Sequence, residues 1–106
     1  MKDILSNAKA QLLKVLGEAR ELLVLPGNDF SWSRWNTELE ALADIDRFVC
    51  KVESGQTFEL IKLEMLFGPT GPIQEVSLSS GWGKEFLSVA AEFDSALAEY
   101  RKRLLC

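Results

Sequence analysis

The most constrained stretch of this chain is Phe67–Glu85, with the sequence FGPTGPIQEVSLSSGWGKE. It contains four of the seven glycines, two of the three prolines and one of the three tryptophans. Proline fixes φ, and glycine permits positive φ values that other residues avoid. We therefore predict a rigid connection over this stretch, with Ile73, Val76 and Leu78 packed into the core.

The segments on either side of this stretch show apolar residues spaced three and four apart, which is typical of amphipathic helices. Long helices are expected over about residues 3–25, over about residues 31–53, and from between Ser80 and Lys84 to about Leu104. Proline and glycine follow the first, and glycine follows the second, as helix ends require. The start of the second helix is open over a few residues because several N-cap residues precede or begin it: Asn28, Asp29, Ser31 and Ser33.

The segment from Thr57 to Phe67 fits two patterns. Its apolar residues have helical spacing, but Ile61, Leu63, Met65 and Phe67 also alternate with charged residues as in a strand. Its leucine, glutamate, lysine and methionine content favours a short helix. The sequence therefore predicts an all-α fold, a small antiparallel bundle of three long helices and one short helix with a Gly/Pro-rich connection. The alternative is an α+β fold with a hairpin at about residues 58–78.

Length and composition indicate one globular domain. The chain has 106 residues, 47% hydrophobic and 26% charged, which suffices for a single core without cross-links. The net charge of −4 argues against a general nucleic-acid binder, which needs clustered basic charge. It is compatible with a basic protein partner.

The N-terminal residues contain no uninterrupted apolar run, and the longest apolar runs are far shorter than the roughly 20 residues that cross a bilayer. We therefore expect a cytoplasmic chain that does not act at a membrane. Cys50 and Cys106 are then expected to be free thiols, the alternative being a disulfide between them.

The residues that most catalytic sites need are missing. The chain has no histidine, which removes serine–histidine and cysteine–histidine catalysis and histidine-based zinc sites. Cys50 is expected to be a partly buried, inert thiol, and the glycine patterns lack the lysine and spacing of a phosphate-binding loop. Asp44 and Asp46 point apart on a helix. We expect no enzyme activity, no cofactor and no metal site.

Two groups of residues are candidates for contact with a partner. Acidic residues of the second helix, with Glu40 and Asp44 as examples, could meet a basic surface, while Gln74, Glu75 and Trp82 could be presented by the rigid connection. For Trp82 the alternative is burial in the core. The cluster of Phe30, Trp32 and Trp35 is expected to anchor the core, and its alternative is an aromatic patch that faces a partner.

The run from Gly68 to Phe86 resembles the signature of a family of small bacterial proteins of unknown function, with Pro-Thr-Gly, Gln-Glu and Gly-Trp-Gly at similar spacing. The resemblance covers roughly residues 57–95 and implies no catalytic residues. In general character the chain also resembles immunity proteins, which are small acidic helical proteins that bind and block bacterial toxins. The expected function is therefore a protein-binding domain, plausible as a toxin inhibitor. The alternative is a structural or regulatory subunit that forms a homo-oligomer.

Overall fold

The computed structural model describes residues 2–31, 33–55, 60–69 and 71–104, with burial of side chains described from residue 6 onward. Within these residues the chain forms α-helices and no strand. The predicted all-α fold is confirmed, and the α+β alternative is wrong because residues 73–78 are helical. The helices are α1 (Lys2–Leu23), α2 (Glu38–Ser54), α3 (Leu60–Phe67), α4 (Pro72–Ser80) and α5 (Gly83–Leu104).

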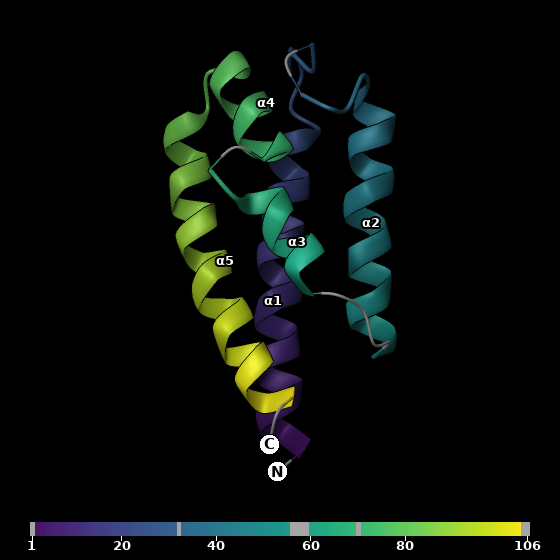
Figure 1. Cartoon of the computed structure of the whole chain (residues 1–106), viewed down its shortest axis with the longest axis vertical. Helices are drawn as coiled ribbons and strands as arrows, with labels where there is room; N and C mark the ends of the chain where they lie inside the picture. The colour runs from purple at the N-terminus through teal and green to yellow at the C-terminus, as the bar shows by residue number, and fades with distance from the viewer. Residues whose placement is uncertain (1, 32, 56–59, 70, 105–106) are drawn as a thin grey trace.

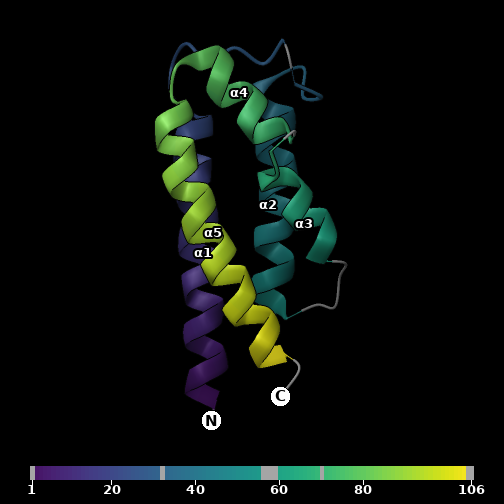
Figure 2. The ribbon, with the colours of Figure 1, turned by 60° about the vertical axis from the view of Figure 1, so that its left-hand side comes forward.

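The three long helices lie side by side, with α1 between α5 and α2 (Figure 1). Both neighbours run antiparallel to α1, so the start of α1 and the end of α5 lie at the same end of the bundle (Figure 2). The short helices α3 and α4 cover the front of α1 in Figure 1. The result is an elongated domain of 43 × 23 × 21 Å.

The core follows from the predicted apolar faces. Leu12, Leu16 and Leu23 of α1 are fully buried, as their spacing on one helix face requires. The rings of Phe67 and Phe93 stack with their centroids 3.9 Å apart, which joins the end of α3 to the middle of α5. The short helices contribute Leu63, Leu66, Ile73 and Val76, all fully buried.

The second helix begins at Glu38 and not near residue 31. Thr37 is the N-cap, because its hydroxyl accepts the Glu40 N–H at 3.2 Å. In the segment before Thr37, the Ser33 hydroxyl accepts a hydrogen bond from the Trp35 N–H at 3.1 Å and donates one to the Trp35 carbonyl at 3.0 Å. These bonds hold the two residues in a non-helical conformation. Trp35 is nevertheless buried, so this tryptophan packs into the core from a loop and not from a helix. Trp32 lies outside the described residues.

The predicted Gly/Pro-rich connection contains a helix of its own, α4. Gly71 is its N-cap, Pro72 occupies its first turn, and Gly81 follows its end with a φ of 87°. The glycines and prolines therefore define the ends of a short helix, and are not spread through an irregular segment. Ile73 and Val76 are buried as predicted, but Leu78 is 68% exposed because helical geometry turns it to the opposite side.

The corner between α4 and α5 is fixed to the segment that follows α1. Trp82 is buried, and its indole Nε1–H donates to Asn28 Oδ1 at 2.8 Å. The Asp29 N–H donates to Ser80 Oγ at 2.8 Å. The Asn28 side chain also donates to the Leu22 carbonyl at 2.9 Å. It therefore bonds both the last turn of α1 and the corner between α4 and α5.

The prediction of a partly buried Cys50 is wrong, because Cys50 is exposed; it is a free thiol in the structure. Cys106, the other cysteine of the disulfide alternative, lies outside the described residues. Over the described part of the chain, no helix is both long enough and apolar enough to cross a membrane.

Two glycine-to-alanine substitutions should change stability in opposite directions. At Gly71 a Cβ would collide with the Met65 carbonyl oxygen and lie 2.9 Å from that of Leu66, whereas at Gly17 it would meet nothing within 4 Å. We expect Gly71→Ala to lower the free energy of unfolding by about 1–3 kcal/mol through backbone displacement. Gly17→Ala, inside α1, should raise it by about 0.5–1 kcal/mol. Urea denaturation measures both, and a neutral Gly71→Ala would show that α4 does not need this close approach.

Candidate functional site

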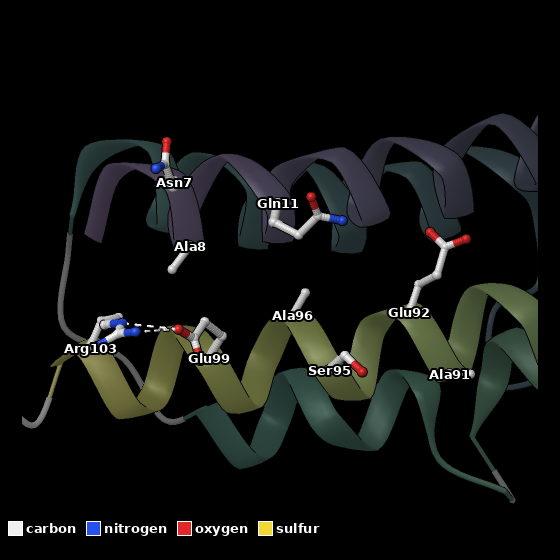
Figure 3. Close-up of a pocket in the computed structure, with 9 residues that line it drawn as sticks. All are labelled: Asn7, Ala8, Gln11, Ala91, Glu92, Ser95, Ala96, Glu99 and Arg103. Carbon is white, nitrogen blue, oxygen red and sulfur yellow. Dashed lines mark hydrogen bonds and ion pairs between the residues drawn. The ribbon is translucent and has the colours of Figure 1, made fainter. Parts of the chain in front are cut away.

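An open groove runs along the seam between α1 and α5 and encloses about 780 Å³ (Figure 3). Ala8 of α1 and Ala96 of α5 point into the space between the two helices in Figure 3, and both are buried. Glu92 reaches from α5 towards α1, and Glu99 forms an ion pair with Arg103 at 2.7 Å. The lining residues are Asn7, Ala8, Gln11, Ala91, Glu92, Ser95, Ala96, Glu99 and Arg103.

A second hollow of about 430 Å³ lies further along the same seam. Both hollows are lined by Glu92 and lie between the same two helices, and we call them together the α1–α5 groove. Its lining combines apolar side chains with four glutamates. The lining residues are Glu18, Glu21, Leu22, Leu25, Glu85, Ser88, Val89 and Glu92. From Glu85 to Arg103 of α5 the lining of the groove extends about 27 Å, at about 1.5 Å per helical residue.

Negative charge is concentrated around Glu18 and Glu92 in this second hollow. The Oε1 atom of Glu18 is shielded from solvent and has no hydrogen-bond partner among the described residues. The pKa of Glu18 is raised, mainly because its carboxyl can share a hydrogen bond with Glu92 once one of the two is protonated. Burial and the negative charge of Glu92 raise this pKa further. Lys14, at 4.0 Å from Glu18, opposes this effect. The groove therefore favours positive charge at this end.

A separate hollow of about 490 Å³ lies between α3 and α4, and we call it the α3–α4 cleft. Ile61 and Met65, four residues apart on α3, line it and are 60% and 59% exposed. Arg34 and Glu75 bring opposite charges to the same cleft. Its remaining lining residues are Glu64, Gly68, Pro69, Gly71 and Pro72.

The two predicted contact residues of α2 are engaged within the chain. Glu40 is exposed, but its carboxylate accepts the Asn36 N–H beside the start of α2. Asp44 is only 19% exposed and accepts hydrogen bonds from the Trp35 indole at 2.8 Å and from Arg47 at 2.6 Å, with Arg34 at 3.2 Å. Burial raises the pKa of Asp44, but these hydrogen bonds and the two arginine charges together lower it below its usual value.

The three predicted contact residues after Phe67 have different surroundings. Trp82 is only 4% exposed, so the prediction that it is presented to a partner is wrong, and the alternative of core burial is confirmed. Gln74 and Glu75 are half-buried on α4. Arg34 bonds Asp44 and lines the α3–α4 cleft, as Glu75 does, so Asp44 and Glu75 lie near the same cleft, although Glu75 and Arg34 form no ion pair among the described residues. The structure does not bring Glu40 into either the cleft or the groove.

Sequence reasoning did not identify the glutamates of the α1–α5 groove. A signal was present in α5, where Glu85, Glu92 and Glu99 are seven residues apart and so share one helix face. Glu18 and Glu21 on α1 are three apart, but only the antiparallel pairing of α1 with α5 places the two sets together. That pairing is a tertiary contact which local periodicity does not encode.

Across the part of the chain that the structure describes, no group of three or more acidic or cysteine side chains is arranged to hold a metal ion. The clustered charges of the groove and the apolar residues between them are instead suited to contact with a charged surface. A comparison with models of known protein families, with curated proteins and with solved structures found no match. The resemblance of residues 68–86 to a family signature therefore stays a prediction.

Asp44 should matter for stability far more than its neighbour Asp46. Asp44→Ala would leave the indole N–H of buried Trp35 without its acceptor, so we expect it to lower the free energy of unfolding by about 1–3 kcal/mol. Asp46 forms a solvent-exposed ion pair with Arg20, and Asp46→Ala should cost at most about 1 kcal/mol. Urea denaturation of both variants makes the comparison, and equal losses would contradict it.

Glu18→Gln should stabilise the domain in a pH-dependent way. Because the folded-state pKa of Glu18 is raised above 4.5, its ionisation disfavours the folded state, and stability is lost as the pH rises through the folded-state pKa. Glutamine removes that loss, so the melting temperature should rise near neutral pH and change little below pH 4.5. Glu53→Gln, at an exposed position on α2, serves as the control and should have little effect at either pH. A Glu18→Gln effect that is independent of pH would exclude ionisation as its cause.

Proposed function

We propose that this chain is a non-enzymatic protein-binding domain that acts by contact through the α1–α5 groove. The observation that carries the proposal is the combination of an open, partly apolar groove with acidic side chains that have no cationic partner. Glu21, Glu85 and Glu92 take part in no ion pair among the described residues. Leu22, Leu25 and Val89 lie among them and supply apolar surface.

The partner in this proposal is a basic protein. Acidic and basic surfaces attract one another over several ångströms and accelerate association, and apolar contact then holds the complex together. This division of roles suits an inhibitor of the immunity or antitoxin type, which binds a basic bacterial toxin domain in the cytoplasm and blocks it sterically. The exposed free thiol of Cys50 is compatible with a reducing compartment.

The groove is a better candidate for this role than the acidic face of α2 that composition first suggested. The carboxylates of Glu40 and Asp44 already accept hydrogen bonds from the chain itself, and a partner that took them would have to replace those bonds. Glu21 and Glu85 are under no such constraint. The binding surface is therefore assigned to the side of the bundle formed by α1 and α5.

A second candidate function is that of a homo-oligomeric subunit, which one observation favours. Ile61 and Met65 present exposed apolar surface beside the α3–α4 cleft, and such surface is enriched at interfaces between subunits. Light scattering over a range of concentrations separates the two candidates. A dimer that Met65→Lys disrupts would favour the subunit, and a monomer at all concentrations would exclude it.

The proposed function is tested by affinity capture with three immobilised forms of the domain. These are the wild type, the groove variant Glu21→Lys/Glu92→Lys, and the control variant Glu53→Lys/Asp94→Lys, which changes the net charge equally at exposed positions outside the groove. We expect a basic protein from the native cell to be retained by the wild type and the control and lost from the groove variant. Titrating that protein with the domain should then abolish its activity at an equimolar ratio.

Circular dichroism establishes that all three forms are folded before capture. Equal retention of the same protein by all three forms would exclude the groove as the binding surface. If no protein is retained by the wild type in preference to the groove variant, the proposal is wrong. A retained partner whose activity is unchanged by the domain would leave a binding protein but exclude an inhibitor.

A further inference from the structure

We propose that the α1–α5 groove takes up a single basic amphipathic α-helix of the partner, which packs as an additional helix alongside α1 and α5. This inference rests on the proposed function and specifies the partner segment. It is carried by the shape of the groove, by the helical nature of both its walls, and by the uneven distribution of charge along it.

The walls of the groove favour a helix over an extended segment. Both walls are α-helices, whose backbone N–H and C=O groups are bonded within each helix. An extended segment would find no strand edge there and would leave its own backbone groups unpaired against apolar side chains, which is costly. A helix satisfies its backbone internally and needs only side-chain complementarity.

The dimensions of the groove fit one helix of about five turns. A length of about 27 Å corresponds to about 18 helical residues. Ala8, Ala91 and Ala96 line the end nearest the start of α1, and small side chains allow helix axes to approach to about 8 Å. At the other end Leu22, Leu25 and Val89 offer apolar surface to a stripe of larger side chains.

The charges of the groove specify where the partner helix is basic. The glutamates at positions 18, 21, 85 and 92 surround one half. The other half is lined by the neutral side chains of Asn7, Gln11 and Ser95 and by the Glu99–Arg103 ion pair, which is already neutralised. Lysine or arginine should therefore flank the apolar stripe in the half of the partner helix that lies against the glutamates, while its other half is small and polar.

A second copy of this chain is a poor occupant. Among the described residues, the cations at the groove are already engaged with glutamates: Arg103 pairs with Glu99, and Lys14 lies 4.0 Å from Glu18. Two grooves brought face to face would oppose glutamate to glutamate, which destabilises an interface. The charge pattern thus selects a partner of opposite sign.

The carboxylates that face one another across the seam link binding to protons. Glu18, Glu21 and Lys14 of α1 and Glu85 and Glu92 of α5 are the charged groups around this half of the groove. A cationic helix would favour the ionised form of Glu18, whose pKa is raised in the free domain by Glu92 and burial. Binding should therefore release protons at pH values near the free-domain pKa.

The test uses two synthetic peptides of about 18 residues, with the same composition, on the three folded forms of the domain. In the first peptide leucines recur at i, i+3, i+4 and i+7, with lysines beside them in one half; in the second the same residues are scrambled so that no apolar face forms. Fluorescence anisotropy measures binding at low and high salt. We expect the first peptide to bind the wild type and the control Glu53→Lys/Asp94→Lys equally. Its binding to Glu21→Lys/Glu92→Lys, and the binding of the scrambled peptide to the wild type, should be at least about tenfold weaker.

Circular dichroism of the bound peptide should show added helix, and calorimetry in buffers of different ionisation enthalpy should show proton release that Glu18→Gln removes. If both peptides bind equally and both lose affinity on the groove variant, the groove binds basic chains but not a helix, and this inference is overturned while the proposed function remains. If the first peptide binds the wild type and the groove variant equally, the groove is not the site of a basic helix. The same conclusion follows if the wild type forms a dimer that the groove variant disrupts. Failure of the peptides together with selective capture of a native partner would likewise overturn the helix alone.

Discussion

The arrangement of this domain depends on the burial of Trp82 at the corner between α4 and α5. Its indole fills the core at the end of the bundle and donates to Asn28, a residue that also bonds the last turn of α1. A buried indole N–H without an acceptor would cost free energy, so the corner is held against the α1–α2 connection. From that corner α5 can only run back along α1, which places the two helices antiparallel and creates the groove between them (Figure 2). Trp82, predicted as a contact residue, thus shapes the α1–α5 groove indirectly, by positioning the helix that supplies one of its walls.

Most of the architecture could be predicted from local patterns, and the errors have physical causes. The apolar spacing of α1, α3 and α5 predicted their extents to within a few residues, because each helix buries one face in the core over much of its described length. The start of α2 was misplaced because Trp35 continues the helical spacing from outside the helix. Thr37 with Glu40 three residues later is the true signal for that start. Helix α4 was missed because it has only nine residues and is rich in serine, although Gly71-Pro72 and Gly81 are the usual residues at its two ends.

The candidate site could be predicted much less well than the fold. Sequence reasoning found the acidic character of the chain but chose carboxylates by their exposure on α2. It could not show that Asp44 is committed to Trp35, Arg34 and Arg47, because two of those partners precede the helix by several residues. Nor could it show that Glu18 faces Glu92, because 74 positions separate them in the chain. The charge pattern of one helix can be read from local sequence, but whether a given charged side chain has an ion-pair partner depends on its tertiary neighbours.

The glutamates of the α1–α5 groove differ in their surroundings from the carboxylates that form ion pairs. Several carboxylates outside the groove meet cations: Asp46 meets Arg20, Glu64 meets Arg101, and Asp44 meets two arginines. Along the α1–α5 seam Glu18, which also lies 4.0 Å from Lys14, is repelled by Glu92, and we expect this repulsion to lower the stability of the free domain near neutral pH. A conflict of this kind between local electrostatics and the fold is expected mainly at functional positions. A cationic helix in the groove would convert the repulsion into attraction, so the same residues that weaken the free domain would strengthen the complex.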